Sequence, residues 1–372
     1  MKSSFLLAIS LFFTTLSVAQ PKKMGFPDVS GYITLTSDFH IHSVFSDGGV
    51  WPSIRVEEAA REGIDAIALT DHLEYQPKKK DIPQPDKNRP YELALSYAKQ
   101  EGIIVVNGAE VTRSNPLGHA NAIYLKDANA LLMDDPATVI REAKKQDAFV
   151  FWNHPSWPTK DTDGMVKLRN IHKTLIDEHM FDGIEVANGQ SFYPNALQIA
   201  LDNNLTIMST SDVHRLTEWD YQLSQGGHRP VTLIFAKERN AESIKEALHN
   251  RRTVAWFKNS LIGRPEHLVP LINASLIAET AKYDGSTHMG EKTVATVNLV
   301  NNSSASFLLQ NIGKYALHNH SAVVEIAANS STVIKVKTLQ KLSAFDLKFK
   351  VLNALVAPDE HPEVSLTVTV QE

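Results

Sequence analysis

The chain alternates between two hydrophobic patterns from Tyr32 to about Phe257. Short apolar runs predict buried strands, and the segments between them repeat apolar residues at helical spacing. The predicted strands lie near residues 33–39, 65–70, 103–109, 148–152, 182–187, 205–210 and 231–236. The predicted helices lie near residues 52–62, 90–101, 136–146, 165–179, 192–203 and 240–250. This alternation predicts an α/β fold with a parallel sheet. A distorted (β/α)7 barrel suits its length, although an open doubly wound sheet would produce the same pattern.

The pattern changes after Gly263 and Pro265. Helical periodicity fades, and short alternating runs such as TVATVNLV, STVIKVKT and EVSLTVTV are separated by Asn, Ser and Asp residues. These runs predict a small antiparallel β-sandwich. We therefore divide the chain into a signal segment at 1–19, a catalytic barrel at 20–264 and an Ig-like accessory domain at 265–372. We expect the accessory domain to cap the barrel, with dimerisation or surface binding as alternatives.

The N-terminus has the layout of a cleaved signal peptide. It carries one lysine, an apolar run from Phe5 to Val18 and a small-residue exit that ends at Ala19. The sequence thus predicts an exported protein, periplasmic or secreted, whose mature chain starts near Gln20. No later stretch approaches the roughly 18 to 20 apolar residues of a membrane span, so none is expected after signal cleavage.

The composition restricts the possible chemistry. The chain has no cysteine, which excludes thiolate zinc sites and a cysteine nucleophile, so any metal must bind to imidazole and carboxylate groups. Loss of Lys2 with the signal leaves 36 basic residues against 42 acidic ones, a net charge of −6. This balance does not favour a nucleic-acid polymer as partner. The oligomeric state is not indicated.

Histidine and carboxylate residues follow one predicted strand after another. In DFHIH, the two-residue period of a strand places His40 and His42 on one face, and Asp47 follows in the next loop. Later strand ends carry TDH (Asp71, His72), GAE (Glu110), GHAN (His119), NHP (His154) and SDVH (Asp212, His214). Each ending alone is equally well explained as a capped or solvated loop. Their agreement predicts a metal cluster, because the carboxyl ends of barrel strands meet at one mouth.

A second His-x-His pair serves as a comparison. His318 and His320 lie in YALHNHSA, where no carboxylate or further histidine motif surrounds them. We interpret this pair as part of a solvated strand or turn rather than a metal site.

The strand-end motifs resemble those of the PHP (polymerase and histidinol phosphatase) superfamily of metal-dependent phosphoesterases over about 20–257. The resemblance implies a distorted barrel with two or three divalent metal ions, commonly zinc, manganese or iron, at its mouth. It implies three metal sites, formed by His40, His42, Glu110 and Asp212; by Glu110 as a bridge with His119 and His154; and by Asp47, His72 and His214. Asp47 stands where some members have histidine, which makes the third site richer in oxygen.

The resemblance also implies an activity. The expected reaction is hydrolysis of a monoester or diester in a small phosphorylated substrate, by attack of a metal-bridging hydroxide. Three residues are candidates for catalysis. Asp212 could be both ligand and proton acceptor, Asp71 could orient His72, transfer a proton or act as a cap, and Arg215 could contact the phosphate. Other candidate phosphate or substrate contacts are Lys78, Lys79, Lys80, Lys87, Arg89, His228, Arg229, Trp152, Trp157, Tyr193 and Trp219.

Two other functions use the same residues. An amidohydrolase-type barrel would cleave an amide or a non-phosphate ester, but such barrels usually bridge their metals with lysine, and here Glu110 takes that place. A non-catalytic binding protein would use the metals structurally, and its β domain would recognise a glycan or a partner. The complete ligand set argues against this second alternative, because a structural site is normally closed by four ligands around one ion.

Overall fold

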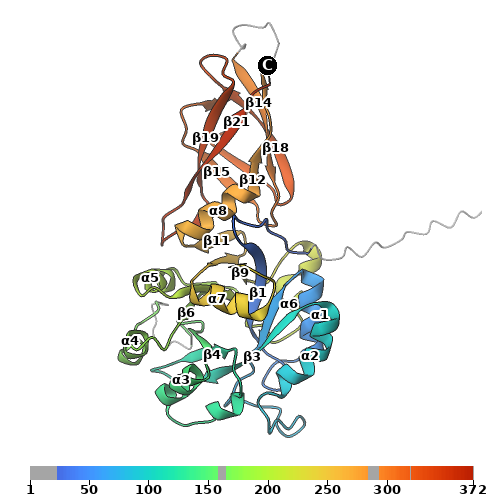
Figure 1. Cartoon of the computed structure of the whole chain (residues 1–372), viewed down its shortest axis with the longest axis vertical. Coiled ribbons are helices and arrows are strands. Elements are labelled where there is room, and N and C mark those ends of the chain that lie inside the picture. Colours follow the sequence, from blue (N-terminus) through green and yellow to red (C-terminus); the bar gives the residue numbers. More distant parts are fainter. Residues whose placement is uncertain (1–22, 158–164, 284–292, 319, 372) are drawn as a thin grey trace, which may run out of the picture.

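The structure, a computed structural model, describes residues 23–157, 165–283, 293–318 and 320–371. An α/β part and an all-β part lie end to end along the long axis of the molecule (Figure 1). The predicted signal peptide at 1–19 lies outside the described residues, so export stays a prediction. None of the helices in the described ranges is long and apolar enough to cross a membrane.

The α/β part contains the predicted alternation. Its strands are β1 (Ile33–Ile41), β2 (Ala66–Leu69), β3 (Ile104–Thr112), β4 (His119–Ile123), β5 (Phe149–Trp152), β6 (Gly183–Asn188), β7 (Ser191–Phe192), β8 (Thr206–Thr210), β9 (Val231–Ala236), β10 (Thr253–Phe257) and β11 (Ser260–Gly263). Its α-helices are α1 (Pro52–Glu62), α2 (Arg89–Glu101), α3 (Pro136–Lys145), α4 (Asn170–Asp177), α5 (Pro194–Asp202), α6 (Thr217–Tyr221) and α7 (Ala241–His249). Every predicted strand and helix is present, although α4 starts later than expected.

The α/β fold is confirmed and its sheet is curled, but the sheet is mixed rather than parallel throughout. Its strand order is β20-β11-β10-β9-β1-β2-β3-β4-β5-β6-β7, where β20 (Ala354–Leu355) comes from the second part, and β8 also pairs with β6. β4 runs antiparallel to both β3 and β5, and β9 runs antiparallel to β1. The physical reason for β4 is the short loop at 113–118. A parallel return needs a crossover of a dozen or more residues, whereas a short loop returns the chain antiparallel.

The curled sheet brings the ends of β1 and β8 together at the mouth. Ile41 and Val213 form a parallel bridge. Two backbone bonds flank it, from Asp212 N–H to the His40 carbonyl (2.9 Å) and from His42 N–H to the Val213 carbonyl (3.1 Å). Residues from distant parts of the chain that were predicted to bind metal are therefore held side by side by the backbone itself.

The outer helices follow local sequence signals. Pro52 occupies the first turn of α1, where its fixed φ suits a helix and its missing N–H is not needed. Gly63 ends the helix in the left-handed region at φ 82°, and a Cβ there would lie 3.0 Å from the backbone nitrogen of Met24. Val56 and Ala59 face the core, where α1 packs against α2. Burial of this stripe fixes α1 beside the strand that carries the first ligands.

The second part begins with a helix that the sequence pattern did not predict. Helix α8 (Pro265–Ser275) buries Leu268, Leu271 and Ile272, which follow the three- and four-residue spacing of one helical face. The helical pattern therefore continues for one helix beyond the point at which the sequence analysis ended it. The error arose because Gly263 and Pro265 were interpreted as a boundary, although proline is also a common first residue of a helix.

The rest of this part is the expected two-sheet sandwich. Its strands are β12 (Leu276–Ala278), β13 (Lys282–Tyr283), β14 (Val294–Asn301), β15 (Phe307–Asn311), β16 (Ala316–Leu317), β17 (Val323–Ile326), β18 (Ser330–Lys337), β19 (Ala344–Val351), β20 (Ala354–Leu355) and β21 (Glu363–Thr369). One sheet has the order β12-β14-β18-β16 with β13 beside β14, and the other has the order β17-β15-β19-β21. β21 buries every second residue, as expected for a strand with one face on the core.

A strand from the second part joins the sheet of the first. β20 pairs in parallel with β11, with Leu261 opposite Ala354 and Ile262 opposite Leu355. The Leu261 amide also donates to the carbonyl of Asn353 at 3.1 Å. One continuous apolar core contains buried residues of both parts. The two parts are therefore packed as one body, and this fixes the β-sandwich beside the mouth of the curled sheet.

Candidate metal centre

The residues predicted to bind metal converge at the carboxyl ends of the strands. Four groups of donor atoms lie within 4.8 Å of one another, and together they contain all nine predicted ligands and no other residue of the described ranges. The groups are His42, Asp47, His72 and His214; His40, His42 and Glu110; His40, His154 and Asp212; and His72, Glu110 and His119.

The first predicted site is formed by the ends of β1 and β8 together with β3. The Nε2 atoms of His40 and His42 lie 3.2 and 3.0 Å from Oδ1 of Asp212. His40 Nε2 is also 3.3 Å from Oε1 of Glu110. Both histidines and Glu110 are completely buried, and the Asp212 side chain is 20% exposed. Asp212 therefore lies between the buried histidines and the open side of the mouth.

Glu110 lies at the centre of the cluster. Its Oε1 atom is 3.1 Å from Nδ1 of His119 and 3.3 Å from Nε2 of His154, which is the arrangement expected for the second site. Its Oε2 atom also contacts Nδ1 of His72, a residue predicted for the third site. One carboxylate thus touches residues of all three predicted sites, which is the position required of a bridging ligand.

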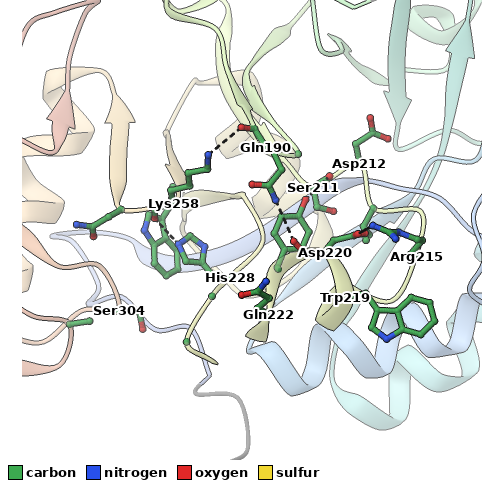
Figure 2. Close-up of a pocket in the computed structure, with 18 of the residues that line it drawn as sticks. Gln190, Ser211, Asp212, Arg215, Trp219, Asp220, Gln222, His228, Lys258 and Ser304 are labelled. Atoms are coloured by element: carbon green, nitrogen blue, oxygen red, sulfur yellow. Dashed lines mark hydrogen bonds and ion pairs between the residues drawn. The ribbon is translucent and has the colours of Figure 1, made fainter. Parts of the chain in front are cut away.

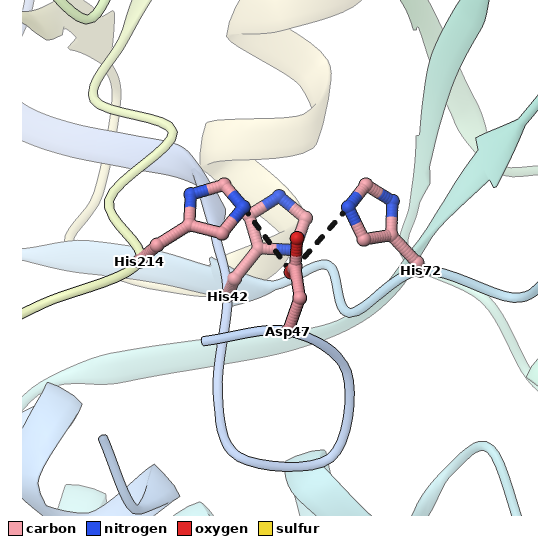
Figure 3. Close-up of side chains that lie close together, drawn as sticks. All are labelled: His42, Asp47, His72 and His214. Atoms are coloured by element: carbon pink, nitrogen blue, oxygen red, sulfur yellow. Dashed lines mark ion pairs between the residues drawn. The ribbon is translucent and has the colours of Figure 1, made fainter. Parts of the chain in front are cut away.

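The third predicted group surrounds Asp47 (Figure 3). Its Oδ1 atom lies 3.2 Å from Nε2 of His214 and 3.5 Å from Nε2 of His72. His42 also approaches this group, with Nδ1 3.8 Å from the same oxygen. His42 therefore stands between the first and third groups, whereas the motifs had assigned it to the first group alone.

Buried polar atoms without hydrogen-bond partners test whether the site suits cations. Within the described part of the chain, these atoms include His40 Nε2, His42 Nε2, Glu110 Oε2, His154 Nδ1 and Asp212 Oδ1. A buried polar atom that lacks a partner costs free energy, and native proteins satisfy nearly all of them. Imidazole nitrogens and carboxylate oxygens are also the ligands that zinc and similar metals bind. The residues present therefore fit a cluster of divalent cations.

The electrostatics of the cluster show the same need for positive charge. Burial raises the pKa of Glu110, but the nearby His40 and His72 outweigh this effect and hold that pKa well below its usual value. Burial lowers the pKa of His72, but Glu110 and Asp47 raise it to about 10. Burial dominates at His42 and lowers its pKa to about 4. The Glu110 carboxylate therefore stays ionised, and bound metal cations would balance its negative charge.

The sequence did not single out Glu185, which lies in the middle of β6. It is completely buried, and its Oε1 atom lies 2.8 Å from Nδ1 of His40. Its Oε2 atom accepts hydrogen bonds from the backbone N–H of His154 at 2.5 Å and from Nδ2 of Asn188 at 2.9 Å. The available signal was a single acidic residue inside the apolar strand GIEVAN. Glu185 therefore holds two predicted ligands in place from outside the cluster.

Of the roles considered for Asp71, its contacts match capping. Its carboxylate accepts hydrogen bonds from the Ser43 amide (2.8 Å), the Ser43 hydroxyl (2.6 Å) and the Ser46 hydroxyl (2.7 Å). His72, which Asp71 was expected to orient, instead places Nδ1 2.6 Å from the hydroxyl of Thr112. Asp71 therefore fixes the loop that leads to Asp47.

The predicted cationic residues mostly bind elsewhere in the protein. Arg215 is 65% exposed and pairs with Asp220. Lys78 donates to the backbone carbonyl of Asp47 at 2.8 Å, so it also stabilises that loop. Arg229 is completely buried and lies between carboxylates at the base of the mouth, out of reach of a substrate. The contacts of these three side chains therefore indicate structural roles and not phosphate binding.

The four predicted aromatic residues divide into two pairs. Trp152 is buried and stacks on His172 with ring centroids 3.9 Å apart, and Tyr193 is 9% exposed. Trp157 and Trp219 are 61% and 66% exposed. Trp157 lies 5.8 and 5.7 Å, between ring centroids, from His119 and His154. Packing therefore explains Trp152, whereas Trp157 stands over the candidate metal centre.

A hollow of about 670 Å³ opens above the cluster, and we call it the metal-side hollow. Tyr75, Trp157 and Tyr193 form part of its wall, and Asp47, His72, His119, His154, Asp212 and His214 form its floor. Arg113 also lines it, but pairs with Glu74 at 2.8 Å. The volume suits a small molecule whose reacting group faces the cluster.

Comparison with known proteins gives a family for both parts. A model of the PHP domain matches residues 38–193, and the Ig-like domain model DUF5001 matches residues 278–367. A solved two-domain protein from Bacteroides vulgatus ATCC 8482, containing a predicted PHP-like metal-dependent phosphoesterase, is 39% identical with a TM-score of 0.85. That comparison covers 93% of this chain and 98% of the other. A comparison with curated proteins finds no match.

Two further solved structures are less similar. A putative metal-dependent phosphoesterase from Bifidobacterium adolescentis is 17% identical, with a TM-score of 0.39 over 48% of this chain and 87% of the other. Histidinol phosphate phosphatase from Lactococcus lactis, complexed with zinc, L-histidinol and phosphate, is 16% identical, with a TM-score of 0.29 over 48% and 86%. Both likenesses are too weak to bear on the site.

Proposed function

Because the chain belongs to the PHP family of metal-dependent phosphoesterases, we propose that it hydrolyses phosphate esters at a cluster of two or three divalent cations. The substrate we propose is a small phosphorylated molecule, either a monoester or a diester. Zinc, manganese and iron are the candidate metals, because all three bind the imidazole and carboxylate groups present here. We also propose that the protein acts after export, as its N-terminal sequence predicts.

The position of Glu110 is the observation that carries this proposal. It lies between His40, His119 and His154, close enough for one carboxylate to contact two cations. A structural metal site has no need of a shared ligand, whereas two-metal hydrolases use one to set the spacing of their ions. Bound cations would lower the pKa of a water molecule and neutralise the phosphoryl oxygens.

The protein's own residues would prepare the cluster for this reaction. Asn153 donates from Nδ2 to Glu110 Oε1 at 2.8 Å, which fixes the plane of the central carboxylate. Glu185 and Thr112 bind the Nδ1 atoms of His40 and His72, which fixes both rings. Asp212 and Asp47 are the ligand carboxylates that are partly exposed, at 20% and 23%. Asp212 is the one that also contacts His40 and His42, so we propose it as the acceptor of a proton from an attacking water.

Metal analysis paired with an activity screen tests the proposal. The purified protein would be stripped, reloaded with Zn²⁺, Mn²⁺ or Fe²⁺, and assayed for phosphate or alcohol release from a panel of phosphate monoesters and diesters. His40→Ala should lose both bound metal and activity while keeping its circular-dichroism spectrum. The matched control is His320→Ala, which changes the second His-x-His pair and should retain both.

The screen also separates the alternative chemistries. Release of an amine or of acetate from amide or carboxyl-ester substrates, without hydrolysis of any phosphate ester, would establish the amidohydrolase alternative. Tight metal binding without hydrolysis of either substrate class would establish a structural metal centre.

A further inference from the structure

Asp212 lines two hollows, and the second extends from the candidate metal centre to the β-sandwich. This second space, which we call the interdomain hollow, has a volume of about 890 Å³. It shares Asp212 and the turn at Gly189 and Gln190 with the metal-side hollow. Figure 2 shows its lining, with Asp212 on one side and Ser304 of the β-sandwich on the other. The two hollows therefore adjoin at these residues, which is where a group attached to a phosphate at the metals would enter the interdomain hollow.

The far wall of the interdomain hollow is held in a fixed position. Ser304 exchanges two hydrogen bonds with the backbone of Gly25, from Gly25 N–H to its hydroxyl and from its own N–H to the Gly25 carbonyl, both 2.9 Å long. The amide of Ser306 donates to Oδ1 of Asn259 at 3.1 Å. These bonds tie the loop between β14 and β15 to the α/β part, so the hollow is already formed without a ligand.

The lining offers neutral polar groups together with one exposed indole. The amides and hydroxyls belong to Gln190, Gln222, Asn259, Ser304 and Ser306. Trp219 lies beside them and is 66% exposed, a large apolar surface to leave in water. Amides and hydroxyls can pair with the hydroxyl groups of a sugar, while an indole face packs on its C–H surface.

The charges in the interdomain hollow do not suit a polyanion. Arg215 is paired with Asp220 beside it in the lining, so these two charges largely cancel. Lys258 donates to the carbonyl of Gln190 at 3.3 Å. His228 has a pKa lowered by burial, and both of its ring nitrogens contact backbone carbonyls. A chain of phosphates would need several uncommitted cations, and the described lining supplies no cluster of them.

We infer that the interdomain hollow binds a carbohydrate group esterified to the scissile phosphate, with the β-sandwich forming one wall of the binding site. This inference rests on the proposed phosphoesterase function. It assigns the β-sandwich a part in substrate selection through Ser304 and Ser306, where the sequence favoured a cap over dimerisation or surface binding. An aliphatic chain fits the lining less well, because it would cover the amides and hydroxyls without pairing them.

Matched substrates test the assignment. The probes are p-nitrophenyl phosphate diesters whose second ester group is either methyl or a sugar, namely glucose, galactose, mannose or N-acetylglucosamine. The leaving group is the same in all of them, so the ratio of kcat/KM for the sugar diester to that for the methyl diester measures recognition of the sugar. The unsubstituted, metal-loaded protein should prefer at least one sugar diester over the methyl diester.

Two substitutions should lower that ratio. Ser306→Trp would fill the hollow from the β-sandwich side, and Trp219→Ala would remove the stacking surface. Each should reduce the ratio roughly 2- to 10-fold, the range expected for loss of one aromatic contact. The matched control is Ser331→Trp, which places the same bulky side chain on an exposed position of β18 and should leave the ratio unchanged. A ratio that is unaltered in both substituted proteins would overturn the inference.

A binding measurement separates this inference from the proposed function. Saturation-transfer NMR with the methyl glycosides of the same four sugars needs no turnover. If neither these diesters nor a monoester such as p-nitrophenyl phosphate is hydrolysed, the proposed function fails, but transfer to a glycoside that Ser306→Trp abolishes still supports a sugar site. If the methyl diester is hydrolysed while no glycoside receives transfer and no sugar diester is preferred, the function stands and the sugar site is refuted.

Discussion

Glu185 places Oε1 2.8 Å from Nδ1 of His40, on the side of the imidazole that faces away from the other predicted ligands. A carboxylate in that position holds the proton on Nδ1 and leaves Nε2 free to bind a metal. Nε2 of His40 is one of the buried atoms without a hydrogen-bond partner, which agrees with this tautomer. Glu185 therefore fixes the orientation of the His40 ring and the nitrogen that carries its proton. The DFHIH motif alone shows neither.

Replacement of this carboxylate should weaken metal binding without unfolding the protein. Glu185→Gln keeps the volume but removes the charge that orients His40, so metal affinity should fall about 10- to 100-fold. Competition with a chromogenic chelator would measure it. Glu178→Gln, at an exposed carboxylate paired with Arg141, is the control and should keep the original affinity. Equal affinities in the two variants would contradict the role of Glu185.

Metal removal should lower the thermal stability of the protein. The buried cluster contains ionised carboxylates, and several of its nitrogen and oxygen atoms have no hydrogen-bond partner. Bound cations would balance the negative charge and coordinate these atoms. A ligand at 100 times its dissociation constant stabilises the folded state by about 2.7 kcal/mol. Calorimetry with and without chelator would show the shift in Tm. The shift should be much smaller in Asp212→Asn; the same shift in that variant would place the stabilising metal elsewhere.

The buried ion-pair network under the mouth should matter far more to stability than exposed pairs do. Arg229 contacts Asp38 at 3.1 Å and also pairs with Glu62, and all three are buried. Arg229→Ala would leave two buried carboxylates unpaired, with an expected loss of about 3–5 kcal/mol. Arg141→Ala, which breaks an exposed pair, should cost roughly 0–1 kcal/mol. Urea unfolding would measure both, and similar losses would contradict this ranking.

His172 should make the protein less stable in weak acid. Its ring is buried against Trp152, and burial lowers its pKa from 6.5 to about 4. Its Nδ1 accepts a bond from the Arg169 amide and its Nε2 donates to the Leu117 carbonyl, so the folded state holds a neutral ring. A ring that is protonated only after unfolding favours the unfolded state as the pH falls.

The sign and window of this effect follow from the two pKa values. The contribution is complete above pH 6.5 and is lost as the pH falls from 6.5 towards 4, at up to about 1.4 kcal/mol per pH unit. Urea unfolding of the metal-free protein at pH 7 and pH 5 would measure it. His172→Gln should show a shallower dependence on pH over this range, and an equal slope would rule out His172 as the cause.

The sequence predicted the strands well because buried strands leave a strong apolar pattern. The order of those strands was harder to foresee. The segment from His119 to Ile123 was interpreted only as a ligand motif, yet it forms β4 and reverses the direction of the sheet. Direction depends on the length of the preceding loop and on which strand edge is free, and a local apolar pattern contains neither piece of information.

The candidate ligands could be predicted because they stand at strand ends, where charged side chains are unexpected unless they bind something. The sequence did not indicate Glu185, because this residue lies in the middle of a strand and its partner His40 is distant in sequence. The sequence could not decide the roles of Asp71 and Arg229 for a related reason. Each has a plausible function beside its sequence neighbours, but its actual partners come from other elements of the fold.

The pairing of Leu261 with Ala354 also constrains how the molecule is assembled during synthesis. The outermost strand of the curled sheet is β20, and this segment leaves the ribosome only after most of the β-sandwich has been synthesised. Until then β11 presents an open edge, which is a place where another chain can add. A newly made α/β part therefore cannot complete its own sheet until residues 354–355 have been synthesised.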